Sequence, residues 1–223
     1  MKGRDRTVVL FSDATIVRET PPLRACWSRI GEAAAVPITG NRAKRVVYGT
    51  LNIGSGALCL DHTSENWNQA TFQAHLRRVR SQWRGWRIVL FLDRGSPHRA
   101  RATRALAKRL GIEFRFLPTA CPELNPVEAL WRYVKNQILA NEPTPDVETA
   151  VQRACDALTA MTQSQRRQTA GTLEDFWLAT KLRRRAIRTQ SLCLCITDQR
   201  TCHPPRALNS PSMRGQQLRS MPA

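Results

Sequence analysis

Two acidic residues follow apolar segments that have the composition of buried strands. Asp13 comes directly after VVLFS, and Asp93 comes directly after RIVLFL. An acid at a strand end emerges at the edge of a sheet, where α/β folds commonly place their ligands. A solvated turn residue that caps the next helix explains Asp93 equally well from its position alone. The two acids are therefore candidates for binding or catalysis, with a structural alternative open.

A third acid, Glu128, lies 35 residues beyond Asp93 in the segment LPTACPELNPVEALWRYVK. It follows Asn125 at the spacing of a capping box, in which a glutamate reaches back to the backbone amide of the helix cap. Helix physics alone favours this capping role for Glu128. Glu123 is explained in a similar way as a loop acid.

The elements that must position these acids follow from the spacing of apolar residues. A continuous apolar run predicts a central strand, recurrence every three or four residues predicts an amphipathic helix, and a Gly-Ser-Gly turn separates two strands. The predicted elements are an extended segment over RTVVLFSDATIVRE, two strands within KRVVYGTLNIGSGALCLDH, a helix from Trp67 to about Trp83, a strand WRIVLFLD, a helix from a cap at Ser96-Pro97 to Leu110-Gly111, a strand IEFRFLP, a helix from Asn125-Pro126 to about Leu139, and a helix from Thr144-Pro145. This order predicts an α/β fold with a mixed five-stranded sheet flanked by helices.

The composition points to a polyanionic partner. Lys and Arg number 35 against 17 Asp and Glu, a formal net charge of +18, and nucleic acid is the first partner to consider for a chain this basic. An ordinary solvated basic surface is the alternative. No segment is apolar for long enough to span a membrane, and the N-terminal residues lack the pattern of a signal peptide, so we expect a cytoplasmic protein. Seven cysteines without paired spacing fit reduced thiols.

The composition changes near residue 180. We expect residues 1–180 to form one domain and residues 181–223 to form a basic, disordered tail, since the tail loses periodicity and carries nine basic residues against one acid. The run KLRRR at 181–185 is either a phosphate-contacting patch or part of an extension without function. The tail residues Cys193, Cys195, Cys202 and His203 match no usual zinc spacing.

Three segments resemble the catalytic blocks of mariner-like DDE transposases, especially their bacterial insertion-sequence branch. FLDRGSPHRA and FLPTACPELNPVEALWRYVK resemble the second and third blocks, which typically read LDNxxxH and LPPYSPxLNPIExxW, and FSDATIVRETPPLRACWSRIGE resembles the first. The 34 residues between Asp93 and Glu128 are the family's spacing. Two departures are Ala14, where the family often has Glu, and Arg94, where it often has Asn. Arg94 can pair with Asp93 or contact a DNA phosphate.

The resemblance implies an RNase H-like fold in which Asp13, Asp93 and Glu128 converge as the catalytic and metal-binding residues. Oxygen ligands of this kind suit Mg²⁺ or Mn²⁺, and a two-metal site holds its ions about 3.5–4 Å apart. The implied reaction is phosphodiester hydrolysis at the end of a mobile element, followed by attack of the freed 3′-hydroxyl on target DNA. This is cut-and-paste transposition.

The implied partners are the DNA of the transposon ends and of the target, and a second copy of the chain in a homodimer. Members of the family carry an N-terminal helix-turn-helix region, which we expect this chain to lack or to receive from a partner chain. A catalytically inactive, truncated remnant that only binds DNA is the alternative. Another RNase H-like nuclease would share the acids but would not explain LPTACPELNPVE.

Further DNA contacts are expected from the block after Asp93. The candidates are His98, Arg99, Arg101 and Lys108, although a solvated helix face explains the basic residues equally well. His98 matches the family's histidine and would face either the metal site or DNA, with an ordinary solvated histidine at a helix start as the alternative. Asp61 and Glu65 are better interpreted as a polar turn than as members of the acidic site. Most of the six tryptophans are expected in the core, among them Trp83, Trp86 and Trp131.

Overall fold

The computed structural model describes residues 6–173 and 176–177. The chain divides into two units, residues 1–189 and 190–223, and the second contains no described residue. The predicted domain boundary at residue 180, the tail 181–223 with its KLRRR run, and its four cysteine and histidine residues therefore lie outside the described residues. Within the described part, no helix is long and apolar enough to cross a membrane.

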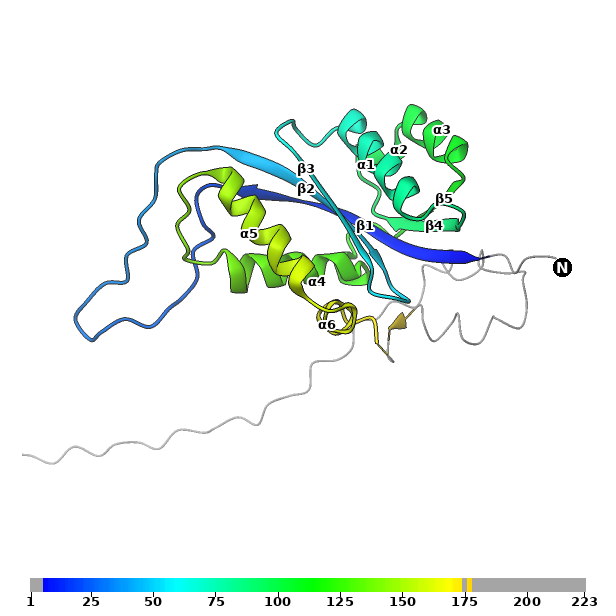
Figure 1. Cartoon of the computed structure of the whole chain (residues 1–223). Coiled ribbons are helices and arrows are strands. Elements are labelled where there is room, and N and C mark those ends of the chain that lie inside the picture. The colour runs from blue at the N-terminus through cyan, green and yellow to red at the C-terminus, as the bar shows by residue number, and fades with distance from the viewer. Residues whose placement is uncertain (1–5, 174–175, 178–223) are drawn as a thin grey trace, which may run out of the picture. The chain divides into compact units, whose positions relative to one another are not determined.

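One mixed sheet organises the described domain, as Figure 1 shows. Its strands are β1 (Thr7–Arg18), β2 (Lys44–Asn52), β3 (Leu58–Thr63), β4 (Arg87–Leu92) and β5 (Ile112–Phe116). They lie in the order β3-β2-β1-β4-β5, with antiparallel pairing from β1 through β3 and parallel pairing of β1 with β4 and of β4 with β5. The predicted mixed five-stranded sheet is confirmed.

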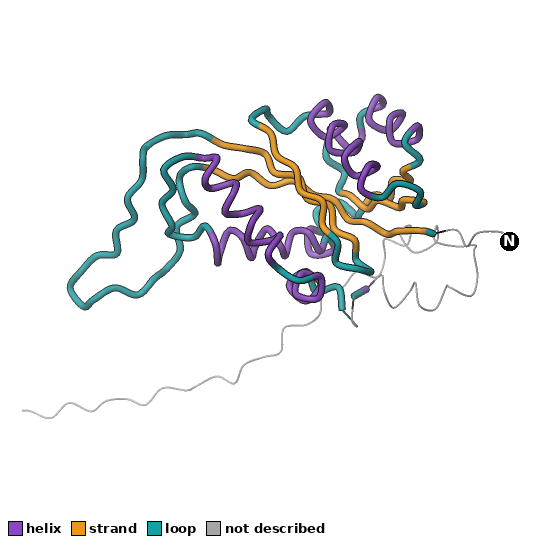
Figure 2. The backbone as a smooth tube through the Cα atoms, in the orientation of Figure 1, coloured by secondary structure: helices purple, strands orange, loops and turns teal. Residues whose placement is uncertain are grey.

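Helices cover both faces of this sheet (Figures 1 and 2). Their bounds are α1 (Gln69–Gln82), α2 (Ser96–Arg99), α3 (Arg101–Arg109), α4 (Pro126–Tyr133), a π-helical continuation at Val134–Ile138, α5 (Val147–Ala160) and α6 (Gln163–Thr169), with a 3₁₀ turn at Pro122–Leu124. Alternating residues of the central strands belong to two hydrophobic cores, one on each face of the sheet. Leu10 and Leu90 pack with α1, whereas Phe11 and Phe91 pack with α4 and α5. This alternation is the period of a strand that is buried on both faces.

Two predicted helix starts were wrong. The helix expected from Ser96 to Gly111 is broken at Ala100, whose backbone is extended (φ −53°, ψ 136°), so α2 and α3 are separate. Gly95, and not Ser96, precedes the first turn of α2, and no side chain caps it. In α5 the cap is Asp146, whose side chain accepts a hydrogen bond from the amide of Thr149.

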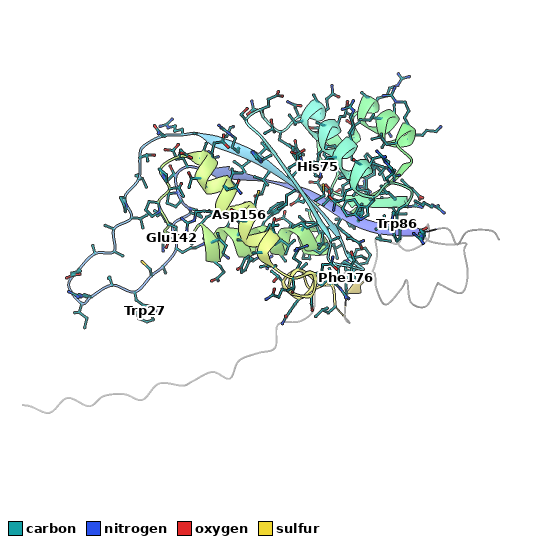
Figure 3. The ribbon with its side chains drawn as sticks, viewed as in Figure 1. Trp27, His75, Trp86, Glu142, Asp156 and Phe176 are labelled. Atoms are coloured by element: carbon teal, nitrogen blue, oxygen red, sulfur yellow. The ribbon has the colours of Figure 1, made fainter. Side chains whose placement is uncertain are left out.

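The tryptophans divide between the core and the surface. Trp83 and Trp131 are buried as expected, 6% and 2% exposed. The core assignment of Trp86 was wrong: it is 39% exposed, and the Arg6 guanidinium lies over its ring. Trp27 is fully exposed on the long loop between β1 and β2, which projects from the body of the domain in Figure 3.

Strand register brings two of the candidate acids to the same level of the sheet. Phe11 of β1 lies beside Phe91 of β4 in a parallel pair, so Asp13 and Asp93 each come two residues further along neighbouring strands. Asp13 is not at a strand end, because β1 continues to Arg18 and pairs there with β2. β4 ends at Leu92, and Asp93 therefore emerges from the edge of the sheet.

Candidate active site

The three predicted acids line one cavity of about 290 Å³. Asp13 reaches it from β1, Asp93 from the residue that follows β4, and Glu128 from the first turn of α4. Arg94 is the only basic residue in the described lining of this acidic cavity. The arrangement gathers three carboxyl groups around one partly enclosed space, where charges interact more strongly than in open water.

Asp13 forms the buried wall of the acidic cavity. Its side chain is almost inaccessible, and its Oδ2 atom accepts no hydrogen bond from a described residue. Burial, followed by the negative charges of Glu128 and Asp93, raises the pKa of Asp13 to about 8, although the Ala14 amide and the Trp131 indole pull it down. A buried acid that has an unpartnered oxygen and faces two other carboxylates is stabilised by a cation.

Asp93 occupies the exposed rim and has the opposite surroundings. Its Oδ1 atom accepts a hydrogen bond from the Gly95 amide at 3.0 Å and lies 2.5 Å from Nδ1 of His98. The hydrogen bond from His98 lowers the pKa of Asp93. Both contacts hold Oδ1, and the side chain of Asp93 is half exposed.

His98 is held in place by aromatic rings. Its side chain is 2% exposed, and its ring lies 4.3 Å from that of Phe72 and 5.5 Å from that of Trp67, centroid to centroid. A Cβ atom at Gly95 would lie 2.5 Å from the Trp67 ring, so any larger residue here would push Trp67 outward. The structure thus places His98 behind Asp93, and not on the surface where the predicted direct contact with DNA would need it.

Glu128 owes its position to the buried residue Asn125. The Asn125 side chain accepts a hydrogen bond from the Val127 amide at the start of α4 and donates one to the carbonyl oxygen of Ser12, each at 3.2 Å. This fastens the start of α4 to the residue before Asp13. The Asn125 amide donates to Pro122 at 2.9 Å, so the cap amide is already satisfied. The capping-box interpretation of Glu128 was therefore wrong, and Glu128 lines the cavity.

Trp131 closes the wall beside Asp13. Gly49 pairs with Asp13 across β1 and β2, and a Cβ atom at Gly49 would lie 2.6 Å from the Trp131 ring. The indole Nε1 is buried without a hydrogen bond of normal geometry, but it lies near enough to Asp13 to lower the pKa of that carboxyl. Neither Gly49 nor Trp131 was singled out as part of the site, since nothing in their spacing indicates a contact between β2 and α4.

Arg94 does not neutralise Asp93. The ion pairs of the described residues do not include this pair, and Nε of Arg94 donates instead to the carbonyl oxygen of Leu117 at 3.3 Å. Three of the basic candidates are exposed, namely Arg99, Arg101 and Lys108. Both a DNA-contacting face and an ordinary solvated face would expose them, so exposure does not distinguish the two.

The other acids considered lie elsewhere. Asp61 pairs with Arg78 and lines a different cavity, and the Glu65 amide donates to the Thr63 side chain, which is a polar turn.

The donor set fits a hard divalent cation without enclosing one. Among the described residues, no three His, Cys, Asp or Glu side chains are grouped closely enough to hold a metal ion between them. Mg²⁺ commonly takes only one or two carboxylates and completes its shell with water and substrate phosphate oxygens. An open cavity with carboxylates on its walls and an unpartnered Oδ2 on Asp13 is compatible with that mode of binding.

The mixed five-stranded sheet, with helices on both faces, has the architecture of an RNase H-like fold. The chain belongs to the DDE superfamily endonuclease family, whose family model matches residues 8–150. That span contains Asp13, Asp93 and Glu128. The family expected from the three sequence blocks is confirmed.

Two curated proteins and two solved structures illustrate the similarity. The insertion element IS630 uncharacterized 39 kDa protein of Shigella sonnei is 28% identical over 137 residues, 60% of this chain and 39% of that protein. Uncharacterized protein y4pE/y4sA of Sinorhizobium fredii (strain NBRC 101917 / NGR234) is 36% identical over 86 residues, 38% of this chain and 62% of that protein.

The first solved structure, the Mos1 strand transfer complex, has a TM-score of 0.58 at 19% identity, covering 74% of this chain and 51% of the Mos1 chain. The second, the catalytic domain of Mos1 mariner transposase, has a TM-score of 0.51 at 16% identity, with 74% and 76% coverage. At these identities the similarity shows the RNase H-like fold alone. The chain spans less than two thirds of the length of both curated relatives.

Proposed function

We propose that this chain is the catalytic domain of a DNA transposase that cleaves phosphodiester bonds and transfers strands in cut-and-paste transposition. The observation that carries the proposal is the single cavity lined by Asp13, Asp93 and Glu128. The family is one of endonucleases, and one relative belongs to an insertion element. DNA is the substrate class that agrees with both and with the net charge of +18.

Asp13, Asp93 and Glu128 would hold Mg²⁺ or Mn²⁺ in this cavity. Mos1 complexes similar to this chain have been solved with Mg and with Mn. A pair of such ions, when bound, activates the attacking oxygen and stabilises the leaving oxygen of a phosphodiester.

The protein's own residues prepare the cavity for this chemistry. His98 and Gly95 orient Asp93 and keep it ionised, and Asn125 sets α4 against β1 so that Glu128 faces Asp13. Trp131 excludes water from the wall beside Asp13. The residues fix three oxygen donors before substrate arrives, which reduces the reorganisation needed at the moment of reaction.

The proposed partners are transposon ends, target DNA and a second copy of the chain in a homodimer. Mos1 neighbours include a paired-end complex with the left transposon end. Because the curated relatives are longer than the matched span, recognition of the ends is proposed to come from a helix-turn-helix region or partner chain outside this domain. His98, as placed here, supports Asp93, whereas Arg99, Arg101 and Lys108 remain candidates for direct DNA contacts.

A second candidate function is a DNA-binding remnant without activity. The observation that favours it is Arg94, a guanidinium in the lining of the acidic cavity that would compete with a cation. The two candidates differ in one measurable property, since only the enzyme requires a divalent metal to change the DNA.

Plasmid nicking by the full chain in Mg²⁺, Mn²⁺ or EDTA tests the proposal. We expect nicking with either metal, none with EDTA, and none from Asp93→Ala. The matched control is Asp61→Asn, which removes an acid outside the acidic cavity and should nick as the unchanged protein does. Binding of DNA without nicking in any metal would favour the remnant, and nicking that survives Asp93→Ala would show that the cavity is not the nuclease centre.

A further inference from the structure

A second open cavity, of about 600 Å³, adjoins the acidic cavity, and Arg94 lines both. Its described lining consists of Arg94, Ser96, Arg99, Ala100, Arg104 and Phe116. Three of these residues carry guanidinium groups and none carries a carboxylate. We call this surface the arginine groove. It places concentrated positive charge next to concentrated negative charge, which an ordinary solvated helix face has no reason to do.

The guanidinium groups of the arginine groove are available to a ligand. Arg94, Arg99 and Arg104 are exposed, and none of them forms an ion pair with a described acid. Arginines nearby behave differently: Arg87 and Arg115 both pair with Glu113 on β5. The positive charge of the groove is therefore not neutralised by the part of the protein that the structure describes.

The break at Ala100 assembles the groove. In one continuous helix, Arg99 and Arg104 would point about 140° apart, because successive residues turn by about 100°. The extended backbone at Ala100 ends α2 and restarts the chain as α3, and both arginines then line the same cavity. Arg94 joins them from the loop after β4. The departure from the predicted single helix thus has a structural consequence at the surface.

We propose that the arginine groove binds the sugar–phosphate backbone of a DNA strand, with the adjoining phosphate of the same strand in the acidic cavity. Guanidinium groups bind phosphate oxygens through two parallel hydrogen bonds, and Phe116 adds apolar surface to the same lining. Arg94, at the junction, contacts the strand where it enters the acidic cavity. This assignment rests on the proposed function in taking DNA as the substrate.

The chain supplies matched controls for this assignment. Arg109 is on α3 and exposed, but it points about 140° away from Arg104 on the helix and does not line the arginine groove. Arg84 is exposed in the turn after α1 and also lies outside the described lining of both cavities. Changing any of these arginines to Gln removes one charge, so a difference between them reports position and not net charge.

The experiment measures binding of a fluorescein-labelled DNA duplex to the full chain by anisotropy, in EDTA, over a series of NaCl concentrations. Each phosphate contact contributes close to one to the slope of log affinity against log salt. We expect Arg94→Gln, Arg99→Gln and Arg104→Gln each to reduce that slope by about 1 and to weaken binding several-fold at a fixed salt concentration. Arg109→Gln and Arg84→Gln should leave the slope unchanged.

The outcomes separate the groove from the nuclease. Equal losses for all five variants, or no loss for any, would overturn the assignment, because binding would then depend on overall charge or on another surface. If unchanged protein never nicks plasmid but the three groove variants alone lose slope, the proposed function fails and the groove stands. If nicking depends on Asp93 and the groove variants bind normally, the groove fails and the proposed function stands.

Discussion

The buried wall and the exposed rim of the acidic cavity carry the same side chain in opposite surroundings. On the wall, Asp13 is packed against Trp131, has an unpartnered Oδ2, and has its pKa raised to about 8 by burial and by Glu128. On the rim, Asp93 is half exposed, and His98 and Gly95 hold its Oδ1 and lower its pKa. The sheet register places the two acids at equivalent positions on neighbouring strands, but the groups around each acid determine whether it is ionised.

This difference predicts opposite contributions to folding stability, unfavourable for the buried wall and favourable for the exposed rim. A buried carboxyl without a partner destabilises the fold whenever it is ionised, whereas a carboxylate that accepts two hydrogen bonds contributes to stability. Groups kept in unfavourable surroundings cluster at functional sites. The comparison predicts that substitutions on the wall and on the rim agree in activity and disagree in stability.

The largest expected effect is on activity, where wall and rim should behave alike. Asp13→Asn and Asp93→Asn should each reduce metal-dependent nicking by at least about a hundredfold, the scale seen when a group that stabilises a transition state is removed. The reason is that each removes a charged oxygen donor while keeping nearly the same shape. Initial rates of plasmid nicking in Mn²⁺ provide the measurement. Retention of activity by either variant would remove that acid from the proposed metal site.

The next effect is on stability, where wall and rim should differ. Between about pH 4 and pH 8 the unfolded chain ionises Asp13 while the folded protein keeps it protonated, so stability falls as pH rises through this window. Asp13→Asn should therefore stabilise the metal-free protein by on the order of a few kcal/mol at pH 8 and by almost nothing at pH 4. Thermal unfolding in EDTA at both pH values measures this difference.

Asp93→Asn provides the opposite sign. Because the folded state lowers the pKa of Asp93, its carboxylate contributes stability above the unfolded pKa, and that contribution is lost as pH falls. The substitution should slightly destabilise the protein at neutral pH and less so in acid. Identical Tm profiles for the two Asn variants would contradict the contrast between wall and rim.

A smaller effect is expected at His98, which supports the rim. His98→Ala leaves Oδ1 of Asp93 with the Gly95 amide alone, and loss of such a supporting hydrogen bond typically weakens metal affinity about 10–100-fold. Titration of Mn²⁺ followed by electron paramagnetic resonance measures the affinity. His98→Asn should restore part of it, since its side-chain amide can donate to the same oxygen.

Phe72→Leu is the control for packing around His98. Phe72 contacts the His98 ring but is not among the residues that bond to Asp93. This variant should lower Tm and leave Mn²⁺ affinity close to that of the unchanged protein. If both variants lose affinity in proportion to their loss of stability, His98 acts only as a core residue.

The features that depend on local periodicity could be predicted from the sequence. The features that depend on contacts between residues far apart in the chain could not. The five strands follow from apolar runs, and the acids follow from motifs that the sheet register then brings level. The break at Ala100 was missed because RARATRALA contains good helix formers, so nothing local marks it. For Glu128, helix spacing alone favoured capping and only the family resemblance pointed to the site, because spacing does not reveal that Pro122 already satisfies the Asn125 amide.

The smallest expected effects come from two glycines that approach tryptophan rings, one on the wall and one on the rim. A Cβ atom would lie 2.6 Å from Trp131 at Gly49 and 2.5 Å from Trp67 at Gly95. Trp131 belongs to α4, is 2% exposed and packs against β2, whereas Trp67 is 37% exposed and can move outward. Gly49→Ala should therefore cost about 1–3 kcal/mol, the usual range for overpacking, and Gly95→Ala about 1 kcal/mol or less.

The order of the two glycine variants should be reversed when the loss of nicking activity is compared with the loss of stability. Movement of Trp67 would loosen His98, so Gly95→Ala should lose more nicking activity per unit of lost stability than Gly49→Ala does. Gly54→Ala, in the turn between β2 and β3, is the control, because its Cβ meets only ordinary contact. Urea unfolding and nicking rates for the three variants give both quantities. A wall glycine that tolerates alanine better than the rim glycine would mean that Trp131 is not fixed, and the rigid wall beside Asp13 would have to be abandoned.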